Sequence, residues 1–359
     1  MNDLSTKIKI ELGNFTLNVE LDIPIHGFMV LFGRSGSGKT TFLRCLSGLE
    51  RAPNGYLKIG NEIWQDESQG IFVPASERKI GYVFQDCALF PHLTILQNIF
   101  FGMNSKEISA QTNKIQNLMN EINISRLSDS FPHELSGGQQ QQVALVRAIA
   151  SDPKIILLDE PYSNLDSRLK EKIRDQMLHI LREHNISALL VTHDPEEAMF
   201  MSDKIGVLNN GVVEQFGSPI DLYLRPKSAF IAEFFGEINL FEGSVDGGLV
   251  NTVLGTFKCS KKLNKNKVTI VIRNEAIKLY AVNKVTSEIV NENAFIVSPY
   301  FGYVMETRLL AGSTLIHLSL KVNQTNFHIH ARIPGLNFFH VNDKVKVLTD
   351  PSQIFVFKK

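Results

Sequence analysis

The sequence has few features that suit a protein to an oxidising compartment or to a bilayer. Its three cysteines, Cys45, Cys87 and Cys259, are widely spaced and form no C-x-x-C pair. This argues against a disulfide framework or a structural zinc site and fits a reducing cytosol. The opening residues MNDLSTKIKIELGN lack an apolar core, so we expect no signal peptide. Stretches such as FMVLF and IILL fall far short of the roughly 20 apolar residues that span a bilayer, so we expect the chain alone to be soluble.

An excess of charge of either sign is also missing. The 37 basic and 37 acidic residues give a formal net charge of +0, which predicts no general attraction to nucleic acid or to acidic lipid. The hydrophobic fraction of 43% and the charged fraction of 21% are those of an ordinary globular protein. With 359 residues, the chain exceeds the size at which a single core stops growing, so we expect two domains.

The spacing of apolar residues along the sequence changes at about residue 235. Before that point, apolar segments alternate with segments of helical spacing, which predicts an α/β domain with a largely parallel sheet. The expected strands are GFMVLFG, IGYVFQ, KIILLDE, ALLVTHD and KIGVLNNG, and the expected helices are KTTFLRCLSGLE, QQQVALVRAIAS, SRLKEKIRDQMLHILREH and DPEEAMFMSD. After it, NKVTIVIRN, TLIHLSLKV, NFHIHARI, DKVKVLTD and IFVFKK alternate with period two and predict a small antiparallel barrel or sandwich. The segment LYLRPKSAFIAEFFGEIN, with Pro226 and a short helix, is the expected junction.

The segment GRSGSGKTT, Gly33 to Thr41, is the strongest short signal for chemistry. It matches G-x-x-x-x-G-K-[ST] and lies between an expected strand and an expected helix, as a phosphate-binding loop requires. Glycines leave the backbone amides free to surround phosphate, and the helix N-terminus adds to their attraction. Lys39 supplies a positive charge for the β- and γ-phosphates, and Thr40 supplies a hydroxyl for Mg²⁺. A glycine-serine turn with a solvated lysine is the alternative, and the flanking strand and helix disfavour it.

Two carboxylates follow another expected strand. Asp159 ends the apolar run KIILLDE, where the acidic residue that positions Mg²⁺ is usual, and Glu160 could polarise a water that attacks the γ-phosphate. By itself an Asp-Glu pair after a strand is more often a turn. The phosphate loop reverses that preference.

In their order and approximate spacing, these motifs resemble ATP-binding-cassette nucleotide-binding subunits of bacterial importers. The shared segments are GRSGSGKTT, LSGGQ, IILLDEP and LLVTHD. The resemblance implies an α/β P-loop ATPase domain over residues 1–235, with a helical subdomain at about 87–150. It also implies a small all-β, OB-like TOBE domain over residues 236–359. ATP and Mg²⁺ are the implied cofactors, and the implied activity is ATP hydrolysis.

The resemblance also assigns roles to individual residues. It implies catalytic roles for Lys39, Gln85, Glu160 and His193, and Mg²⁺ ligation by Thr40, Gln85 and Asp159. ATP contacts are implied for Gly33, Arg34, Ser35, Gly36, Ser37, Gly38, Lys39, Thr40 and Thr41. Phe15 is the nearest aromatic that could stack on adenine, although it lies closer to the phosphate loop than is usual, and a core role is the alternative.

The four glutamines Gln139–Gln142 would, on composition alone, be a solvated low-complexity patch. In the resemblance, Ser136, Gly137, Gly138 and Gln139 instead form the signature that contacts ATP bound by the opposite subunit. Gln142 stands where the family commonly has an arginine. Because that arginine supports the helix, we expect tuning of the activity and not its loss.

The implied partners are a second copy of the chain, two transmembrane permease subunits and a substrate-binding protein. The implied assembly is a head-to-tail homodimer on the cytoplasmic face of the bacterial inner membrane, with Asp166 at the dimer interface. Ferric iron is the expected cargo, and molybdate, another oxyanion or polyamine is the alternative. A cassette ATPase of DNA maintenance is a remote rival, because the segment between Thr41 and Leu135 is too short for a long coiled coil.

Three histidines in the second region raise a separate hypothesis. His328 and His330 are expected to share one strand face, and His317 could lie near them, which is compatible with a metal sensor. A pair of histidines two residues apart on an exposed strand is more often simply solvated, and that is the interpretation we favour.

Overall fold

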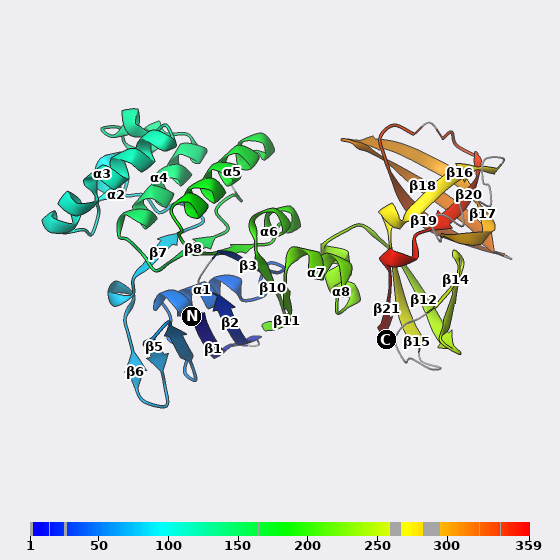
Figure 1. Ribbon diagram of the computed structural model, residues 1–359, viewed down its shortest axis with the longest axis horizontal. Helices are drawn as coiled ribbons and strands as arrows, with labels where there is room; N and C mark the ends of the chain where they lie inside the picture. The colour runs from blue at the N-terminus through cyan, green and yellow to red at the C-terminus, as the bar shows by residue number, and fades with distance from the viewer. Residues whose placement is uncertain are drawn as a thin grey trace. The chain divides into compact units, whose positions relative to one another are not determined.

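The computed structural model describes residues 3–13, 15–24, 27–163, 165–258, 267–282, 295–322, 324–337 and 339–359. Contacts along the chain divide it into two compact units, Met1–Pro219 and Ile220–Lys359 (Figure 1). The short helix α7 (Pro219–Leu224) overlaps the start of the expected junction at residues 222–239, and a second short helix, α8 (Ala229–Phe234), lies within it. The short helix predicted after Pro226 is therefore confirmed as α8.

A mixed sheet of eleven strands forms the centre of the first unit, as far as the described residues show. In spatial order the strands are β6 (Ile71–Phe72), β5 (Glu62–Asp66), β4 (Tyr56–Ile59), β1 (Asp3–Leu12), β2 (Phe15–Pro24), β11 (Val212–Gly217), β10 (Lys204–Asn209), β3 (Phe28–Phe32), β9 (Ala188–Thr192), β8 (Ile155–Asp159) and β7 (Ile80–Val83). The neighbours from β10 to β7 run parallel to one another. The five strands predicted for this region are confirmed and form this parallel part.

The parallel strands are buried because their sequences are continuously apolar, as expected for strands covered on both faces. Every residue of β3, β8 and β9 is buried. Polar or glycine residues follow each of these strands, and parallel strands end at the same edge of their sheet. That edge therefore collects Gly33, Glu160 and His193 from segments far apart in the chain.

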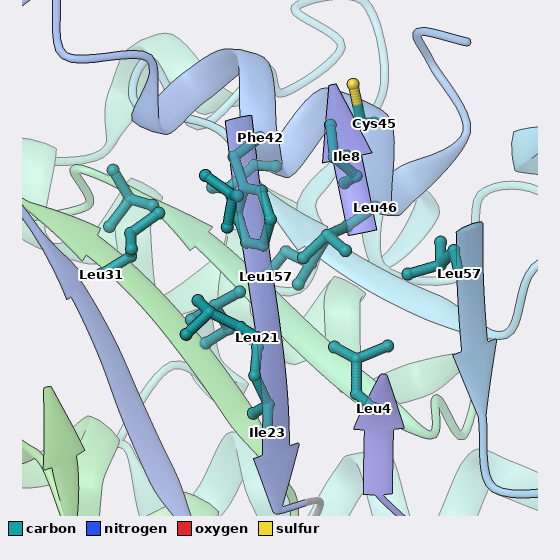
Figure 2. Close-up of a cluster of buried hydrophobic side chains, with 14 of the residues drawn as sticks. Leu4, Ile8, Leu21, Ile23, Leu31, Phe42, Cys45, Leu46, Leu57 and Leu157 are labelled. Carbon is teal, nitrogen blue, oxygen red and sulfur yellow. The ribbon is translucent and has the colours of Figure 1, made fainter. Parts of the chain in front are cut away.

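The other part of the sheet is antiparallel except where β11 pairs with β2, which is a parallel contact. Strands β1 and β2 pair along ten residues, and β1 also pairs with β4. Along β1, Leu4, Ile8 and Ile10 are buried among alternating exposed or half-buried residues, which is the pattern of a strand with one face on the core. Figure 2 shows side chains from these strands meeting Phe42 and Leu46 of α1 (Lys39–Ser47), so the helix after the phosphate loop packs on this core.

Helices α2 (Ile95–Ile99), α3 (Ser105–Glu121), α4 (Gly137–Ala150) and α5 (Ser167–Glu183) lie together at one end of the first unit in Figure 1. The sixth helix, α6 (Pro195–Met201), follows β9. The helices predicted at 39–50, 140–151, 167–184 and 194–203 are confirmed as α1, α4, α5 and α6. Side-chain caps begin several of them, and Asn104 and Glu107 form a reciprocal capping box at α3.

The second unit contains two antiparallel sheets with five strands each. One has the order β14 (Gly255–Lys258), β13 (Leu249–Thr252), β12 (Ile238–Asp246), β15 (Lys267–Arg273) and β21 (Ile354–Lys358). The other has the order β16 (Ile277–Ala281), β20 (Lys344–Thr349), β17 (Ile296–Leu310), β18 (Ser313–Val322) and β19 (Thr325–Pro334). The inward residues of both sheets form one core, and the five strands predicted here are confirmed. Across the described residues, no helix has both the length and the hydropathy needed to cross a membrane.

Candidate functional site

The phosphate loop lies between β3 and α1, where the sequence predicted it. Gly36 and Gly38 have φ values of 78° and 101°, in the left-handed region that other residues rarely adopt. At Gly33 the requirement is one of space, because an added Cβ would lie 2.4 Å from the carbonyl oxygen of Leu208. The loop therefore needs glycine at all three positions, for two different reasons.

The loop leaves polar groups available for an anion. Helix α1 begins after Gly38 without a side-chain cap, so its first amides are not satisfied by a neighbouring side chain. The buried Ser37 hydroxyl also has no hydrogen-bond partner within the part of the chain that the structure describes. Free amides at a helix N-terminus, beside an unsatisfied hydroxyl, fit the phosphate groups of a nucleotide.

Lys39 reaches back over this loop. Its side chain is 4% exposed, and Nζ donates to the carbonyl oxygens of Gly33 at 2.8 Å and Arg34 at 3.0 Å. Glu160 Oε1 lies 3.7 Å from the same nitrogen. Burial lowers the pKa of Lys39, and the charges of Glu160 and Asp159 oppose that shift. Lys39 is thus an ammonium group held among acceptors at the place where phosphate oxygens would bind.

Thr40 and Asp159 form an oxygen-rich pair beside the loop. Thr40 Oγ1 donates to Asp159 Oδ1 at 3.1 Å, and the hydroxyl of Tyr82 donates to Asp159 Oδ2 at 3.2 Å. Burial raises the pKa of Asp159, while these two hydrogen bonds act to lower it. A hydroxyl beside a partly desolvated carboxylate is a donor set that suits Mg²⁺ next to phosphate.

Glu160 and His193 meet at the ends of β8 and β9. His193 Nδ1 lies 2.9 Å from Glu160 Oε2, and the His193 side chain is 51% exposed. Glu160 has a φ of 44°, an unusual backbone conformation for a residue other than glycine. Such strain is typical of functional positions, where the fold holds one side chain in place. The carboxylate is thereby fixed between Lys39 and His193.

The predicted residues outside this cluster are placed as follows. Gln85 is exposed in the turn after β7, and the structure describes no hydrogen bond from its side chain to the described residues. Phe15 is half-buried, and its ring lies 3.0 Å from where a Cβ on Gly38 would be. This position beside the phosphate loop is compatible with both an adenine contact and a core role.

Ser136 and Asp166 begin helices. Ser136 and Gln139 form a reciprocal capping box at α4, with Gln139 Oε1 accepting from the Ser136 amide at 2.9 Å. Asp166 Oδ1 accepts from the Leu169 amide at 3.0 Å at the start of α5. Ser136, Gly137 and Asp166 are exposed. These exposed residues make none of the phosphate-site contacts described above. They are therefore available for a contact with another subunit.

The glutamines after the signature each have a definite environment. Gln140 Nε2 donates to the Pro132 carbonyl oxygen at 2.9 Å, and Gln141 is 3% exposed. Gln142 Nε2 donates at 2.9 Å to the side-chain oxygen of Gln176 on α5. An amide pair therefore joins α4 to α5 at the position where the resemblance led us to expect an arginine.

Sequence reasoning missed two arginines and a tyrosine that support the site. Arg78 donates to the carbonyl oxygens of Cys45 and Leu46 at the end of α1, at 2.8 Å and 2.7 Å. Arg147 of α4 donates at 2.7 Å to the carbonyl oxygens of the turn that follows Gln85. The third is Tyr82, described above. Their partners are distant in sequence, so no local motif marks them.

The remaining sequence hypotheses concern histidine and cysteine. The rings of His317 and His330 face each other across β18 and β19, with centroids 4.4 Å apart, and His328 is exposed. Among the described residues, the ligand atoms that do converge are those of Glu121, His179 and Glu183 on the surface of the first unit. The metal-sensor hypothesis therefore gains no support.

Cys45 and Cys87 are buried free thiols. Burial raises the pKa of Cys45 to about 12 and that of Cys87 to about 11. Both are therefore unreactive at neutral pH. Cys259 lies outside the described residues.

Known proteins are similar to this chain in sequence, and a solved structure is similar to it in fold. A family model described as ABC transporter matches residues 16–163. The chain is 41% identical over 229 residues to the spermidine/putrescine import ATP-binding protein PotA of Vibrio vulnificus, covering 63% of this chain and 59% of that protein. It is 41% identical over 248 residues to the Fe(3+) ions import ATP-binding protein FbpC 2 of Pectobacterium atrosepticum, covering 69% and 71%. It is 32% identical over 358 residues to the sulfate/thiosulfate import ATP-binding protein CysA of Neisseria meningitidis serogroup B, covering 97% and 94%.

The solved structure of cbiO1 from Clostridium perfringens, part of the ABC transporter complex cbiONQ, has the same fold. It superposes with a TM-score of 0.55 at 24% identity, covering 63% of this chain and 92% of that one. The chain therefore belongs to the ATP-binding-cassette family of ATPases, in which it is similar to import ATP-binding proteins. The predicted class of fold is confirmed. The chain spans 59% of the length of the Vibrio relative and nearly all of the Neisseria relative.

Proposed function

We propose that this protein is the ATP-hydrolysing subunit of a bacterial importer. The observation that carries the proposal is the convergence of Lys39, Thr40, Asp159, Glu160 and His193 beside a phosphate loop. Helix α1 and the ends of strands β8 and β9 supply these groups at one edge of the parallel sheet. A site that only bound nucleotide would not need Glu160 and His193 at hydrogen-bond distance from each other.

Each side chain has a role in the proposed hydrolysis. The loop amides and Lys39 hold the β- and γ-phosphates, and Thr40 and Asp159 would hold Mg²⁺, joined by Gln85. When bound, Mg²⁺ neutralises charge that develops on the phosphate oxygens. Glu160 accepts a proton from the attacking water, and His193 orients Glu160 and contacts the γ-phosphate. The short distance between Glu160 and His193 supports this pairing.

We propose that two copies assemble head to tail, each binding ATP across the interface. Ser136, Gly137, Gly138 and Gln139 of one copy would then complete the site of the other, with Asp166 beside them. Ser136, Gly137 and Asp166 are exposed and Gln139 is half-buried at the starts of α4 and α5, which supports this assignment, whereas Gly138 is buried. ATP binding would favour the closed dimer and hydrolysis the open one, because only the closed state uses both surfaces.

The chain would act on the cytoplasmic face of the bacterial inner membrane, with two permease subunits and a substrate-binding protein. We assign residues 1–235 to the ATP-binding domain, including a helical subdomain at about 87–150, and residues 236–359 to a TOBE-like domain. The antiparallel sheets of the second unit support the latter. We propose no nucleic-acid partner, because the 37 basic and 37 acidic residues cancel in net charge.

We propose ferric iron as the cargo, supported by the 41% identity to the Pectobacterium iron protein over 71% of its length. An oxyanion is the second candidate, because the Neisseria sulfate protein matches nearly the whole chain, its second unit included. Molybdate and polyamine are further candidate cargoes, and the same uptake experiment tests them. Uptake of labelled iron, sulfate, molybdate and spermidine should be measured in cells with and without the gene. A defect confined to one cargo would identify it, and an oxyanion defect would overturn iron.

The substitution Glu160→Gln tests the hydrolysis. It keeps the shape of the side chain but removes the base, so we expect kcat to fall by about 10²–10⁴-fold. ATP should then hold the variant as a dimer in gel filtration. Glu171→Gln, an exposed position on α5, is the matched control and should keep its activity. Undiminished turnover in Glu160→Gln would refute the assigned base.

A further inference from the structure

A partly buried ion cluster packs against the segment that carries His193. Lys170 Nζ, on the first turns of α5, lies 2.5 Å from Asp194 Oδ2 and 2.6 Å from Glu197 Oε1. The Glu197 side chain is only 4% exposed, and its other oxygen accepts a hydrogen bond from the Thr192 hydroxyl. A buried carboxylate of this kind requires a cation partner, and Lys170 is that partner.

The cluster holds both neighbours of His193. Thr192 is fixed through Glu197, and its hydroxyl accepts from the Asp194 amide at 3.0 Å. Asp194 is fixed through Lys170, and its other oxygen caps α6 by accepting from the amide of Glu197. His193 itself is half exposed and lies within reach of Glu160. Lys170 therefore holds the backbone on both sides of His193, through Asp194 directly and through Glu197 and Thr192.

The same lysine stands one helical turn from Asp166. The Lys170 amide donates to the Asp166 carbonyl oxygen at 2.9 Å, and Asp166 caps the helix through its side chain. A shift of the start of α5 would be carried to Asp194, because Lys170 is attached to both. Burial disfavours the charge of Lys170, but the hydrogen bonds to Asp194 and Glu197 outweigh it and raise its pKa. The link thus stays charged at neutral pH.

We propose that Lys170 is a positioning residue that couples the surface around Asp166 to the placement of His193. This inference rests on the proposed function, in which Asp166 lies at the dimer interface. A subunit that docks on Asp166 would in this way align His193 with Glu160 in the same chain. Hydrolysis would thereby depend on the closed dimer through contacts within each subunit as well as across the interface.

The substitution Lys170→Met tests the positioning. Because misplacing a reacting group by about 1 Å can lower a rate by about 10²-fold, we expect a loss of kcat of that order. The KM for ATP should change less than about twofold, since Lys170 contacts neither the phosphate loop nor Thr40. Lys170→Arg keeps the charge and should restore most of kcat. Lys172→Met makes the same chemical change at an exposed position of α5 and should behave as the wild type.

Asp194→Asn gives a second variant in case Lys170→Met folds poorly. Asparagine retains a cap for α6 but loses the charge that Lys170 binds, so kcat should again fall with KM unchanged. The coupling to the interface is tested by combining Lys170→Met with Asp166→Ala. If Lys170 transmits the effect of Asp166, the double variant should lose no more kcat than the worse single variant.

Three results would overturn the inference. They are wild-type kcat in Lys170→Met, no rescue by Lys170→Arg, or losses from Asp166→Ala and Lys170→Met that multiply independently. An inactive wild-type protein would instead refute the proposed function and this inference with it. Full activity in the wild type with an unaffected Lys170→Met would refute only the inference.

Discussion

Arg78 should be one of the main supports of the helix that carries Lys39 and Thr40. Its guanidinium is buried and donates to the carbonyl oxygens of Val73, Cys45 and Leu46 at 2.7–2.8 Å. Two of these carbonyls belong to the last turn of α1, where the helix itself leaves carbonyls unpaired, and the Cys45 oxygen also accepts from the Gly48 amide at 3.2 Å. The substitution Arg78→Met would fill much of the same space and leave all three acceptors without this donor.

The expected loss follows from two opposing contributions. Each hydrogen bond from a charged donor contributes about 1.5–3 kcal/mol, so the three short bonds give roughly 5–9 kcal/mol. Burial lowers the pKa of Arg78 to about 10 from 12.5, and at 1.36 kcal/mol per pKa unit this opposes the gain by about 3 kcal/mol. Subtracting the burial cost from the hydrogen-bond contribution leaves roughly 2–6 kcal/mol. Because hydrogen bonds in one cluster are not additive, we expect a net destabilisation near the low end of this range, about 3 kcal/mol.

The assay is urea unfolding followed by the fluorescence of Trp64, the chain's single tryptophan. Trp64 is 3% exposed in the core of the first unit, so its signal reports the unit that contains Arg78. A loss of about 3 kcal/mol would lower the melting temperature of a unit of this size by about 6–12 °C. ATP affinity should fall as well, because α1 would fray from its C-terminal end.

Arg51→Met is the control, since it makes the same chemical change at a partly exposed arginine. Arg51 forms a two-point pair with Glu67 at the surface, and such pairs contribute little to stability. If Arg78→Met shifts the unfolding midpoint no more than Arg51→Met does, the carbonyl cluster does not support α1 and the reasoning is wrong.

Three further predictions concern the same unit. Gln142→Ala should lower stability by about 1 kcal/mol through loss of the pair with Gln176, while Gln142→Arg should leave ATPase activity within about threefold of the wild type, since one hydrogen bond is gained for another. Asp159 has a raised pKa, so the folded chain binds the Asp159 proton more tightly than the unfolded chain does. The free energy of unfolding therefore falls as pH rises from the unfolded pKa of 3.8 through the higher folded pKa. Asp159→Asn should accordingly raise the melting temperature at pH 7 and abolish hydrolysis. Gly211→Ala should lower the free energy of unfolding in urea by more than about 2 kcal/mol, because Gly211 has a left-handed φ and its new Cβ would lie only 2.0 Å from a β2 carbonyl oxygen. Gly70→Ala is the control: Gly70 has a similar φ but open space around it, so the loss should be about 1 kcal/mol.

The strands of the parallel sheet and the groups at their ends could be predicted because their signals are consecutive in the chain. Continuous apolar runs marked β3, β8 and β9, and the residues that follow each run proved to meet at one edge. Strands β1 and β2 are absent from the prediction, although their alternating pattern is visible in KIKIEL and LNVELDI. Their neighbours β4 and β11 could not be deduced, because sheet order depends on loops that join distant segments.

Helix α4, which begins with the glutamine run, likewise combines a motif that can be predicted from sequence with a long-range contact that cannot. Motif spacing identified the signature, but nothing in the sequence indicated that Gln142 would meet Gln176, 34 residues further along the chain. The supporting contacts of Arg78 and Lys170 are likewise long-range, and both residues look like ordinary surface cations in the sequence. Their burial is decided by what packs around them.

The sequence by itself determined the chemistry of the phosphate loop, because a loop that wraps an anion is built from adjacent residues. It also determined the class of each unit through hydrophobic periodicity, which is a local property. Only the tertiary structure decided that Glu160 contacts both Lys39 and His193, and that Lys170 holds the loop behind His193. These contacts arise where separate strands end side by side, and their strength depends on a burial that no single segment creates alone.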